Sequence, residues 1–422
     1  MSAAARLAKL GHAVTLLERA DRLGGALTSV SLDGFTWDAG PSHTLLPAVV
    51  RDLFRKSGRP LERELDLEPL DLVREHRFED GSVVRLPGGS RAAQLRAVDD
   101  LGPGFGTAWV EHVASYGDTW ELLRRELYER VLDPDLAPKE LRGLLRSRLS
   151  LHKHTRDRLR DERLRLMATH TAVAAGHDPR NVPAWAGLTI HLEQLFGAWT
   201  VPGGLHPLGT AMAERLVTRK VDVVLGTTAE DLVLRDGRVV AVATSEGTID
   251  ADAVVVAVDP RRLPALAPAV RRTMPAIPPV VTHVGLDGDV PDLPHEVVLH
   301  GDPLLVVRTG GSAPDGAHAW TVHGRGRIAE DLLTALARQG IDVRKQVVVR
   351  VDRSPRELVE QWGGSPMGVL WRGPRTAHER LGARTPIAGV HAAGAHATTG
   401  FGLPFAALSA ALVAEVLGRA DR

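Results

Sequence analysis

The chain has 422 residues, more than one ordinary hydrophobic core contains, so we expect two domains. Its 52 Lys and Arg residues balance 52 Asp and Glu residues, which argues against a global charge field and against a nucleic-acid partner. The absence of cysteine excludes disulfides, thiolate zinc sites, cysteine nucleophiles and a flavin attached through a cysteine thioether.

Simple patterns also bear on location and on metal binding. No apolar run approaches the roughly 18 residues that span a bilayer, and no secretory leader is recognisable, so we expect a cytoplasmic protein. The eighteen histidines show no metal-ligand spacing such as H-E-x-x-H. We therefore expect no metal site, and we expect most histidines to lie at the surface or in pockets.

The beginning of the chain has the pattern of half a dinucleotide-binding unit. Residues 3–9 predict a helix, Gly11 a left-handed cap, and residues 13–17 a short apolar strand that ends at Glu18. In a βαβ unit, the acid that ends the second strand hydrogen-bonds the adenosine ribose. No first strand and no G-x-G-x-x-G loop precede the helix. We expect about fifteen residues of this motif to lie upstream of the given sequence.

Two glycine-containing stretches follow. Gly24 and Gly25 are a pair that lets the backbone approach a bulky ligand, here soon after the ribose-binding acid. Residues 38–42, Asp-Ala-Gly-Pro-Ser, predict a tight turn that can run beside a flat ring. Both stretches are therefore candidate contacts of a pyrophosphate or a flavin.

The next part of the chain is predicted to be mainly helical. The pattern indicates a helix over 45–58, a hairpin over 72–86 and helices over about 90–196. Within these helices, residues 139–165 carry ten basic residues against four acids, interleaved with leucines. One hypothesis is a helix pair that packs its leucines inward. The other is peripheral contact between this basic amphipathic segment and an anionic membrane surface.

A second organised block begins at residue 199. A Pro-Gly-Gly turn at 202–204 leads to a predicted helix over 208–219, a hairpin over 234–244 and an apolar strand over 254–258. A strand that is apolar on both faces is typical of the middle of a sheet.

The remainder predicts a mixed sheet and then a distinctive terminal segment. The predicted elements of the sheet are strands over 280–286, 304–308, 319–323 and 346–353 and a helix over 328–338. The terminal segment has a short strand over 390–393, a glycine-rich turn over 394–404 and a helix over 405–417. Glycines before a helix N-terminus favour an anion there, because the free N–H groups converge.

Together these pieces resemble the FAD-dependent oxidoreductases of the amine-oxidase-like flavoprotein superfamily, and within it the phytoene desaturase and retinol saturase branch. The terminal segment is the most specific part of the resemblance, because it reads Gly394-Ala395-His396 and then Gly400-Phe-Gly-Leu-Pro404. Two positions depart from the pattern. Ala26 stands where an arginine often follows the glycine pair, and Thr399 stands where a proline is common.

The resemblance implies an α/β fold of two domains. The first is a Rossmann-like FAD-binding domain that is built from discontinuous segments, and the second is an inserted α+β substrate domain. The FAD-binding segments would be 1–75, 197–265 and 380–422, and the substrate domain would comprise 76–196 and 266–379.

The resemblance also assigns roles to individual residues. Glu18 would bind the adenosine ribose, Ala229 would offer its backbone to the adenine, and the helix after Pro404 would direct its dipole at negative charge. No catalytic residue follows from the motifs. Three histidines that lie next to the predicted flavin-contacting motifs are candidate proton acceptors, namely His43, His206 and His396. The full set of residues implied to contact a non-covalent FAD is Glu18, Arg19, Gly24, Gly25, Gly40, Pro41, Ser42, Ala229, Gly394, Ala395, Gly402, Leu403 and Pro404.

The reaction implied is a desaturase-like dehydrogenation. A C–H bond of an apolar, carotenoid-like or isoprenoid-like substrate would transfer hydride to flavin N5, and a proton would leave the neighbouring carbon. The electron acceptor, oxygen or a quinone, stays open.

Two alternatives also stay open. The first is an amine or other heteroatom oxidase on the same fold, for which Trp199 and Trp371 could line a pocket, although only 4% of the residues are aromatic. The second is a truncated, non-catalytic protein with impaired FAD binding. The G-x-G-x-x-G phosphate loop, which the given sequence lacks, would have supplied several N–H donors to the pyrophosphate.

Overall fold

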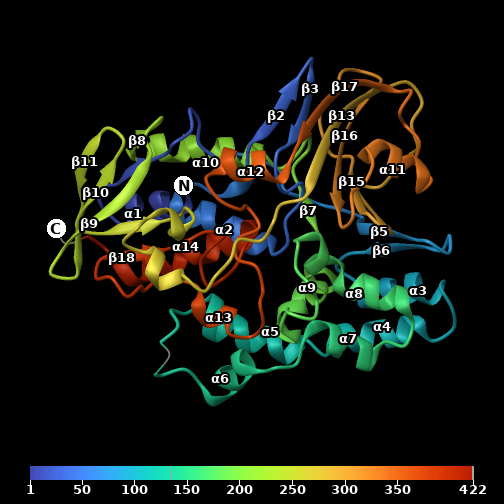
Figure 1. The fold of residues 1–422 in the computed structure, drawn as a ribbon, viewed down its shortest axis with the longest axis horizontal. Coiled ribbons are helices and arrows are strands. Elements are labelled where there is room, and N and C mark those ends of the chain that lie inside the picture. Colours follow the sequence, from blue (N-terminus) through green and yellow to red (C-terminus); the bar gives the residue numbers. More distant parts are fainter. Residues whose placement is uncertain (134, 421–422) are drawn as a thin grey trace.

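The computed structural model describes residues 1–133 and 135–420. Pro134 and the last two residues of the predicted 380–422 segment therefore lie outside the described residues. Figure 1 shows a region of short strands and long helices around the two chain ends, a large sheet at the opposite end, and a layer of helices along one side. The predicted α/β class is confirmed.

Two pairs of parallel strands lie in the region around the chain ends. β1 (Thr15–Leu17) pairs with β8 (Asp222–Val224), and β12 (Val254–Val256) pairs with β18 (Val390–Ala392). The predicted strand over 254–258 is thus two residues shorter. Among the described residues it has one partner strand, β18, whereas its apolar pattern predicted the middle of a sheet.

Four helices pack on these strands around one apolar cluster. They are α1 (Ser2–Lys9), α2 (Pro47–Ser57), α10 (Pro207–Thr218) and α14 (Leu403–Leu417). Gly11 ends α1 with a φ of 99°, as its predicted capping role requires. The buried side chains of the cluster include Ala5, Val50, Leu53, Phe54, Leu208, Met212 and Ala407. Segments from both ends and the middle of the sequence therefore share one core.

The described residues also form three small antiparallel sheets, of which the β2–β3 pair packs on the large sheet. One is the predicted D-G hairpin with an added strand, and the other two are two-stranded. Their strands are β9 (Ala229–Arg235), β10 (Arg238–Thr244) and β11 (Gly247–Asp250); β2 (Ser29–Leu32) and β3 (Phe35–Asp38); and β4 (Glu68–Pro69) and β7 (Trp199–Thr200).

The large sheet has seven strands. In order they are β17 (Val347–Arg353), β13 (Val280–Asp287), β16 (Ala317–Arg325), β15 (Leu304–Arg308), β14 (Glu296–His300), β5 (Leu72–Phe78) and β6 (Val83–Pro87). The predicted hairpin over 72–86 supplies two of them, and the parallel pairing of β14 with β5 joins it to the rest. β5 crosses the predicted boundary at residue 75, so that boundary falls within a strand. The division into two domains stays a prediction.

The two faces of this sheet differ. Helix α11 (Leu332–Arg338) covers one face, whose buried side chains include Val284, Leu286, Val297, Val307 and Trp320. This helix begins later than predicted, because the Asp331 side chain accepts hydrogen bonds from the Leu333 and Thr334 N–H groups and so caps it. The opposite face, called the inner face below, carries charged residues and histidines.

Helices predicted over 90–196 are present along the side of the molecule (Figure 1). They are α3 (Arg91–Asp99), α4 (Phe105–Ala114), α5 (Gly117–Leu123), a π-helix (Arg124–Tyr128), α6 (Lys139–Arg146), α7 (Leu151–Arg158), α8 (Glu162–Ala174) and α9 (Thr189–Phe196). Two further helices lie near the C-terminal part, α12 (Pro355–Trp362) and α13 (Thr376–Glu379).

The basic segment 139–165 is divided among α6, α7 and the first turn of α8. Its leucines at 141, 145, 151, 159 and 164 are buried, which agrees with the hypothesis of helices that pack inward. Peripheral membrane contact stays a prediction. Among the described residues, no helix combines the length and the apolar character that crossing a bilayer requires.

Candidate functional site

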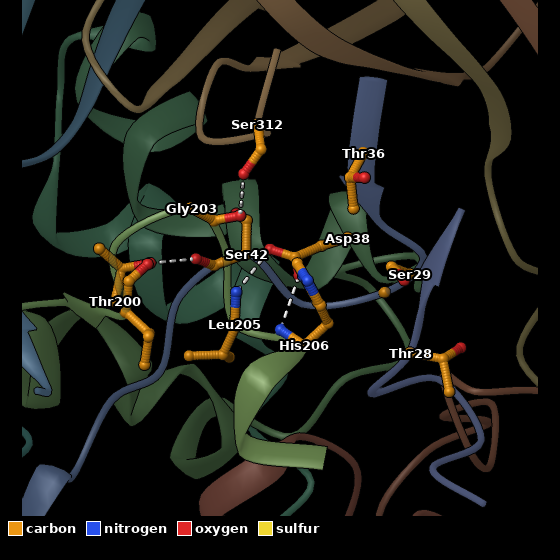
Figure 2. Close-up of polar contacts among 12 residues, drawn as sticks. Thr28, Ser29, Thr36, Asp38, Ser42, Thr200, Gly203, Leu205, His206 and Ser312 are labelled. Carbon is orange, nitrogen blue, oxygen red and sulfur yellow. Dashed lines mark hydrogen bonds and ion pairs between the residues drawn. The ribbon is translucent and has the colours of Figure 1, made fainter. Parts of the chain in front are cut away.

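The Asp38 loop is tied to the turn that precedes α10 (Figure 2). Asp38, the last residue of β3, accepts hydrogen bonds from the N–H groups of Leu205 and His206, both at 2.8 Å, and its Oδ1 lies 3.0 Å from His206 Nδ1. Gly204 has a φ of 121°, and a Cβ there would lie 3.0 Å from the Asp38 carboxylate. The predicted Pro-Gly-Gly turn therefore needs glycine both for its conformation and for this close approach.

Ser42 anchors the other end of this loop. Its carbonyl accepts hydrogen bonds from Thr200 Oγ1 at 2.9 Å and from His295 Nε2 at 3.1 Å. Its own hydroxyl is buried and has no hydrogen-bond partner among the described residues. Ser312 Oγ donates to the Gly203 carbonyl at 3.2 Å, so the loop between Arg308 and Ala317 of the large sheet also holds the turn (Figure 2).

Gly40 packs against Ala26, the residue that follows the glycine pair. Gly24 and Gly25 have φ values of 122° and 57°, and the Thr28 hydroxyl donates to the Gly25 carbonyl at 2.8 Å. A Cβ on Gly40 would clash with the Ala26 carbonyl. The two glycine-containing stretches singled out in the sequence thus pack against each other.

Glu18 and Ala229 also lie on adjacent segments. Glu18 directly follows β1, its Oε1 accepts the Ala20 N–H at 2.9 Å, and its carbonyl accepts the Thr227 N–H at 3.1 Å. Ala229, the first residue of β9, comes two residues after Thr227. Arg19 instead donates to the carbonyls of Glu360 and Gln361 at the end of α12, at 2.6 and 2.8 Å. Its guanidinium therefore contacts protein, and its predicted role in cofactor binding stays a prediction.

The terminal turn leads directly into α14. Gly394, with a φ of 89°, donates its N–H to Ser409 Oγ at 2.9 Å, and Ala395 is packed so closely that a Cβ on Gly368 would clash with its carbonyl. Gly402 is the N-cap residue, so Leu403 and Pro404 belong to the first turn, two residues earlier than predicted. No side chain of the described residues caps this N-terminus.

The three candidate histidines have different surroundings. His206 pairs with Asp38. His43 has a side chain that is 14% exposed and lies 3.9 Å from Glu296; burial lowers its pKa to about 3, although Glu296 opposes this. His396 lies 4.0 Å from Asp259, and burial lowers its pKa against the attraction of that carboxylate. Only the His206–Asp38 pair has the short contact between imidazole and carboxylate that orients a general base.

A buried ion-pair network on the inner face was not found from the sequence. Arg74 donates to both oxygens of Glu193 at 2.9 and 2.7 Å and to Glu296 at 3.0 Å, and Arg308 Nε donates to Glu296 at 3.0 Å. Burial acts to raise the pKa of Glu296, but Arg308, His43 and Arg74 hold it well below its usual range. Arg308 Nη1 also donates to the Gly40 carbonyl at 3.2 Å, which links this face to the Asp38 loop.

A histidine cluster continues along the inner face. His76 Nδ1 and His300 Nε2 share a hydrogen bond of 2.8 Å, and the His170 ring of α8 lies edge-on to both. Eight of the eighteen histidines are buried: His76, His112, His170, His177, His283, His300, His391 and His396. Every second residue along β5 lies on the inner face, namely Arg74, His76 and Phe78. The two polar residues of this alternating set were the sequence signal for the polar character of the face.

The residues fit a bound dinucleotide flavin. Glu18 closes a parallel strand, the N-terminus of α14 has no side-chain cap, and the Ser42 hydroxyl is buried without a partner among the described residues. Such groups suit a ribose, a pyrophosphate and a polar ring edge respectively. When bound, FAD supplies a hydride acceptor, and the chain supplies binding and orientation.

These features define a flavin-dependent oxidoreductase of the dinucleotide-binding type. Residues 1–417 match the family described as flavin containing amine oxidoreductase, and the chain belongs to that family. The superfamily predicted from the sequence is therefore confirmed, and membership places the chain among FAD-dependent oxidoreductases.

Similar proteins come from both the desaturase and the amine oxidase sides of the family. The chain is 29% identical over 218 residues to a phytoene desaturase (neurosporene-forming) of Cereibacter sphaeroides, covering 51% of this chain and 42% of the relative. It is 28% identical over 231 residues to a 4,4'-diapolycopene oxygenase of Methylomonas sp, covering 53% and 46%. The matched region thus spans about half the length of these relatives.

A solved structure resembles almost the whole fold. Cyclohexylamine oxidase from Brevibacterium oxydans IH-35A superposes with a TM-score of 0.67 at 16% identity, over 99% of this chain and 96% of that one. At this identity the likeness concerns the fold alone.

Proposed function

We propose that this chain catalyses a flavin-dependent oxidation of a small substrate that carries polar groups, as an amine or other heteroatom oxidase does. The substrate would lie beside the Asp38 loop, close to where this loop contacts the inner face of the seven-stranded sheet. FAD, when bound, would supply the hydride acceptor for a C–H bond of the substrate, and the proton released from the adjacent heteroatom would pass to a base, for which the His206–Asp38 pair is the best candidate.

The observation that carries this proposal is the polarity of the inner face next to the loop. Arg308 joins the two through the Gly40 carbonyl, and Glu296 lies 3.9 Å from His43. A hydrocarbon polyene in this place would leave buried polar atoms such as His43 Nδ1 without a partner, at a cost in free energy. A substrate with its own hydrogen-bond donors and acceptors could provide partners for these buried polar atoms.

Desaturation of an apolar, isoprenoid-like substrate is the second candidate. The names of the relatives with 28–29% identity favour it, as does the Gly394 to Pro404 sequence. In that reaction, loss of a hydride together with a proton from the neighbouring carbon forms a C=C bond.

Anaerobic flavin reduction distinguishes the candidates. Purified protein is first assayed for bound FAD and then mixed without oxygen with benzylamine or with phytoene in detergent micelles, while flavin absorbance is recorded. Bleaching by the amine alone supports the first candidate, and bleaching by phytoene with growth of a longer polyene chromophore supports the second. Protein that retains no FAD on purification contradicts both.

A further inference from the structure

The last turn of α12 and the residues after it reach both pairs of parallel strands. This stretch, residues 359–368, is called the strap below. Helix α12 directly follows β17, so the chain passes here from the seven-stranded sheet to the region around the chain ends. Four residues of the strap are buried, namely Gly363, Gly364, Ser365 and Gly368. The strap therefore packs against other segments and is not a free loop.

Arg19 attaches the strap to the end of β1. It comes two residues after that strand, and its Nη2 donates to the carbonyls of Glu360 and Gln361 at 2.6 and 2.8 Å. The last carbonyls of a helix lack partners in the next turn and form the negative end of the helix dipole, so a guanidinium is favoured there. One side chain thus makes two charge-assisted hydrogen bonds to the strap.

Two glycines place the strap on the other parallel pair. A Cβ on Gly364 would lie 2.9 Å from Asp259 Cβ and 3.5 Å from His396 Nε2. A Cβ on Gly368 would clash with the Ala395 carbonyl. Asp259 follows β12, and Ala395 and His396 follow β18. These contacts therefore lie beyond the carboxyl ends of both strands.

The strap thus extends across the carboxyl ends of three parallel strands, β1, β12 and β18. In open α/β sheets, ligands bind in the crevice outside these ends. Glu18 and the turn over 394–404 lie at the same ends, and both are predicted to contact FAD. The part of FAD that they hold would therefore lie next to the strap.

Two buried polar atoms at the strap have no hydrogen-bond partner within residues 1–133 and 135–420, namely Trp362 Nε1 and His396 Nδ1. The side chain of His396 is 9% exposed, and the Asp259 carboxylate lies 4.0 Å away, beyond hydrogen-bond distance. Buried polar groups without partners are unfavourable. The hydroxyl and phosphate oxygens of a dinucleotide can supply such partners.

We propose that the strap closes over bound FAD and that Arg19 is the positioning residue that holds it closed. FAD enters and leaves when the strap opens, and Arg19 acts on the strap and not on the cofactor. Two exposed charge-assisted hydrogen bonds should favour the closed strap about tenfold. The proposal requires FAD binding alone and is independent of the substrate that is oxidised.

Hydrogen exchange and FAD release test the strap together. Exchange is measured by mass spectrometry on peptides covering 354–368, and release by the fluorescence of free flavin after dilution of the FAD-loaded protein. Arg19→Gln should speed both about tenfold, because both pass through the open strap. Arg19→Lys should lie between, because it keeps the charge and loses the fork. Addition of FAD to FAD-depleted protein should slow exchange in the strap.

Arg356→Gln is the matched control on α12. The Arg356 side chain is 86% exposed and pairs with the Glu360 carboxylate, so its loss should change either rate less than about twofold. Exchange in β13 and β16 should be equal in all variants, which shows that the fold is kept.

Three outcomes decide the proposal. Faster FAD release from Arg19→Gln, with unchanged strap exchange in the FAD-depleted protein, would mean that Arg19 contacts FAD directly and would overturn its role in holding the strap. Failure of added FAD to slow strap exchange would overturn the closure over FAD. The expected rates, together with a flavin that neither benzylamine nor phytoene reduces, would support the strap and contradict the proposed function.

Discussion

The carboxylate of Asp38 closes the turn that begins α10. It accepts the backbone N–H groups of Leu205 and His206 at 2.8 Å each and contacts the His206 ring at 3.0 Å. One side chain at the end of β3 thus fixes the turn at Leu205, which is 167 residues later in the sequence. The geometry of the loop and of the candidate base both depend on it.

Replacement of Asp38 should therefore loosen the turn. In Asp38→Ala two N–H groups lose a charged acceptor, so we expect a loss of about 2–4 kcal/mol in the free energy of unfolding and a lower FAD content. Urea denaturation measures the free energy of unfolding, and the flavin-to-protein absorbance ratio measures the FAD content. Asp66→Ala, at an exposed acid, should change neither. Equal stability of the two variants would show that the Asp38 contacts contribute nothing.

Local patterns predicted the elements better than their partners. The helix over 3–9, the hairpin over 72–86 and the terminal helix follow from periodicity, glycines and turn residues, which act within a few positions. The place of β5 in the seven-stranded sheet depends on β14, more than 200 residues later in the chain. No local signal specifies such a pairing.

The candidate site shows the same limit. The glycine pair and Gly40 were recognised because glycine is required where backbones approach closely. Arg74 was not, since a single arginine in a strand resembles a solvent-exposed residue until Glu193 and Glu296 are seen beside it.

The buried histidines should make the protein sensitive to acid. Burial lowers the pKa of His43, His112 and His300 to about 3 and that of His177 and His283 to about 4. Unfolded histidine has a pKa of about 6.5, so below that pH the unfolded state binds more protons, and stability falls. Each group contributes about 1.4 kcal/mol per pH unit.

Urea denaturation at pH 8, 7, 6 and 5 measures this dependence. We expect little change between pH 8 and 7 and a steep loss between pH 6 and 5, approaching about 7 kcal/mol per pH unit for the five groups. His112→Leu should reduce the slope by about one proton, whereas His318→Leu, at an exposed position, should leave it unchanged. A flat profile down to pH 5 would mean that these rings are not buried as neutral groups.

The inner-face network should depend strongly on Arg74. In Arg74→Met, Glu193 stays buried without its partner and Glu296 loses one of its two arginine partners, so we expect a loss of about 3–5 kcal/mol. Arg85 on the adjacent strand β6 pairs with Glu75 but has a side chain that is 69% exposed, so Arg85→Met should cost less than about 1 kcal/mol. Chemical denaturation of both variants gives the comparison. Similar losses would contradict a special role for the buried network.

Two glycine-to-alanine changes should have opposite effects. Gly40 has an ordinary backbone conformation, yet its Cβ would clash with the Ala26 carbonyl, so Gly40→Ala must displace the glycine-pair loop and should cost about 1–3 kcal/mol. Gly143 lies exposed within α6 with open space around it, so Gly143→Ala should add about 0.5–1 kcal/mol through helix propensity. Thermal unfolding of the two variants shows whether each substitution raises or lowers the stability of the protein. FAD content should fall in Gly40→Ala and stay constant in Gly143→Ala, because only the first change moves the loop predicted to contact the flavin. A Gly40→Ala protein with normal stability and full FAD would place that loop away from the cofactor.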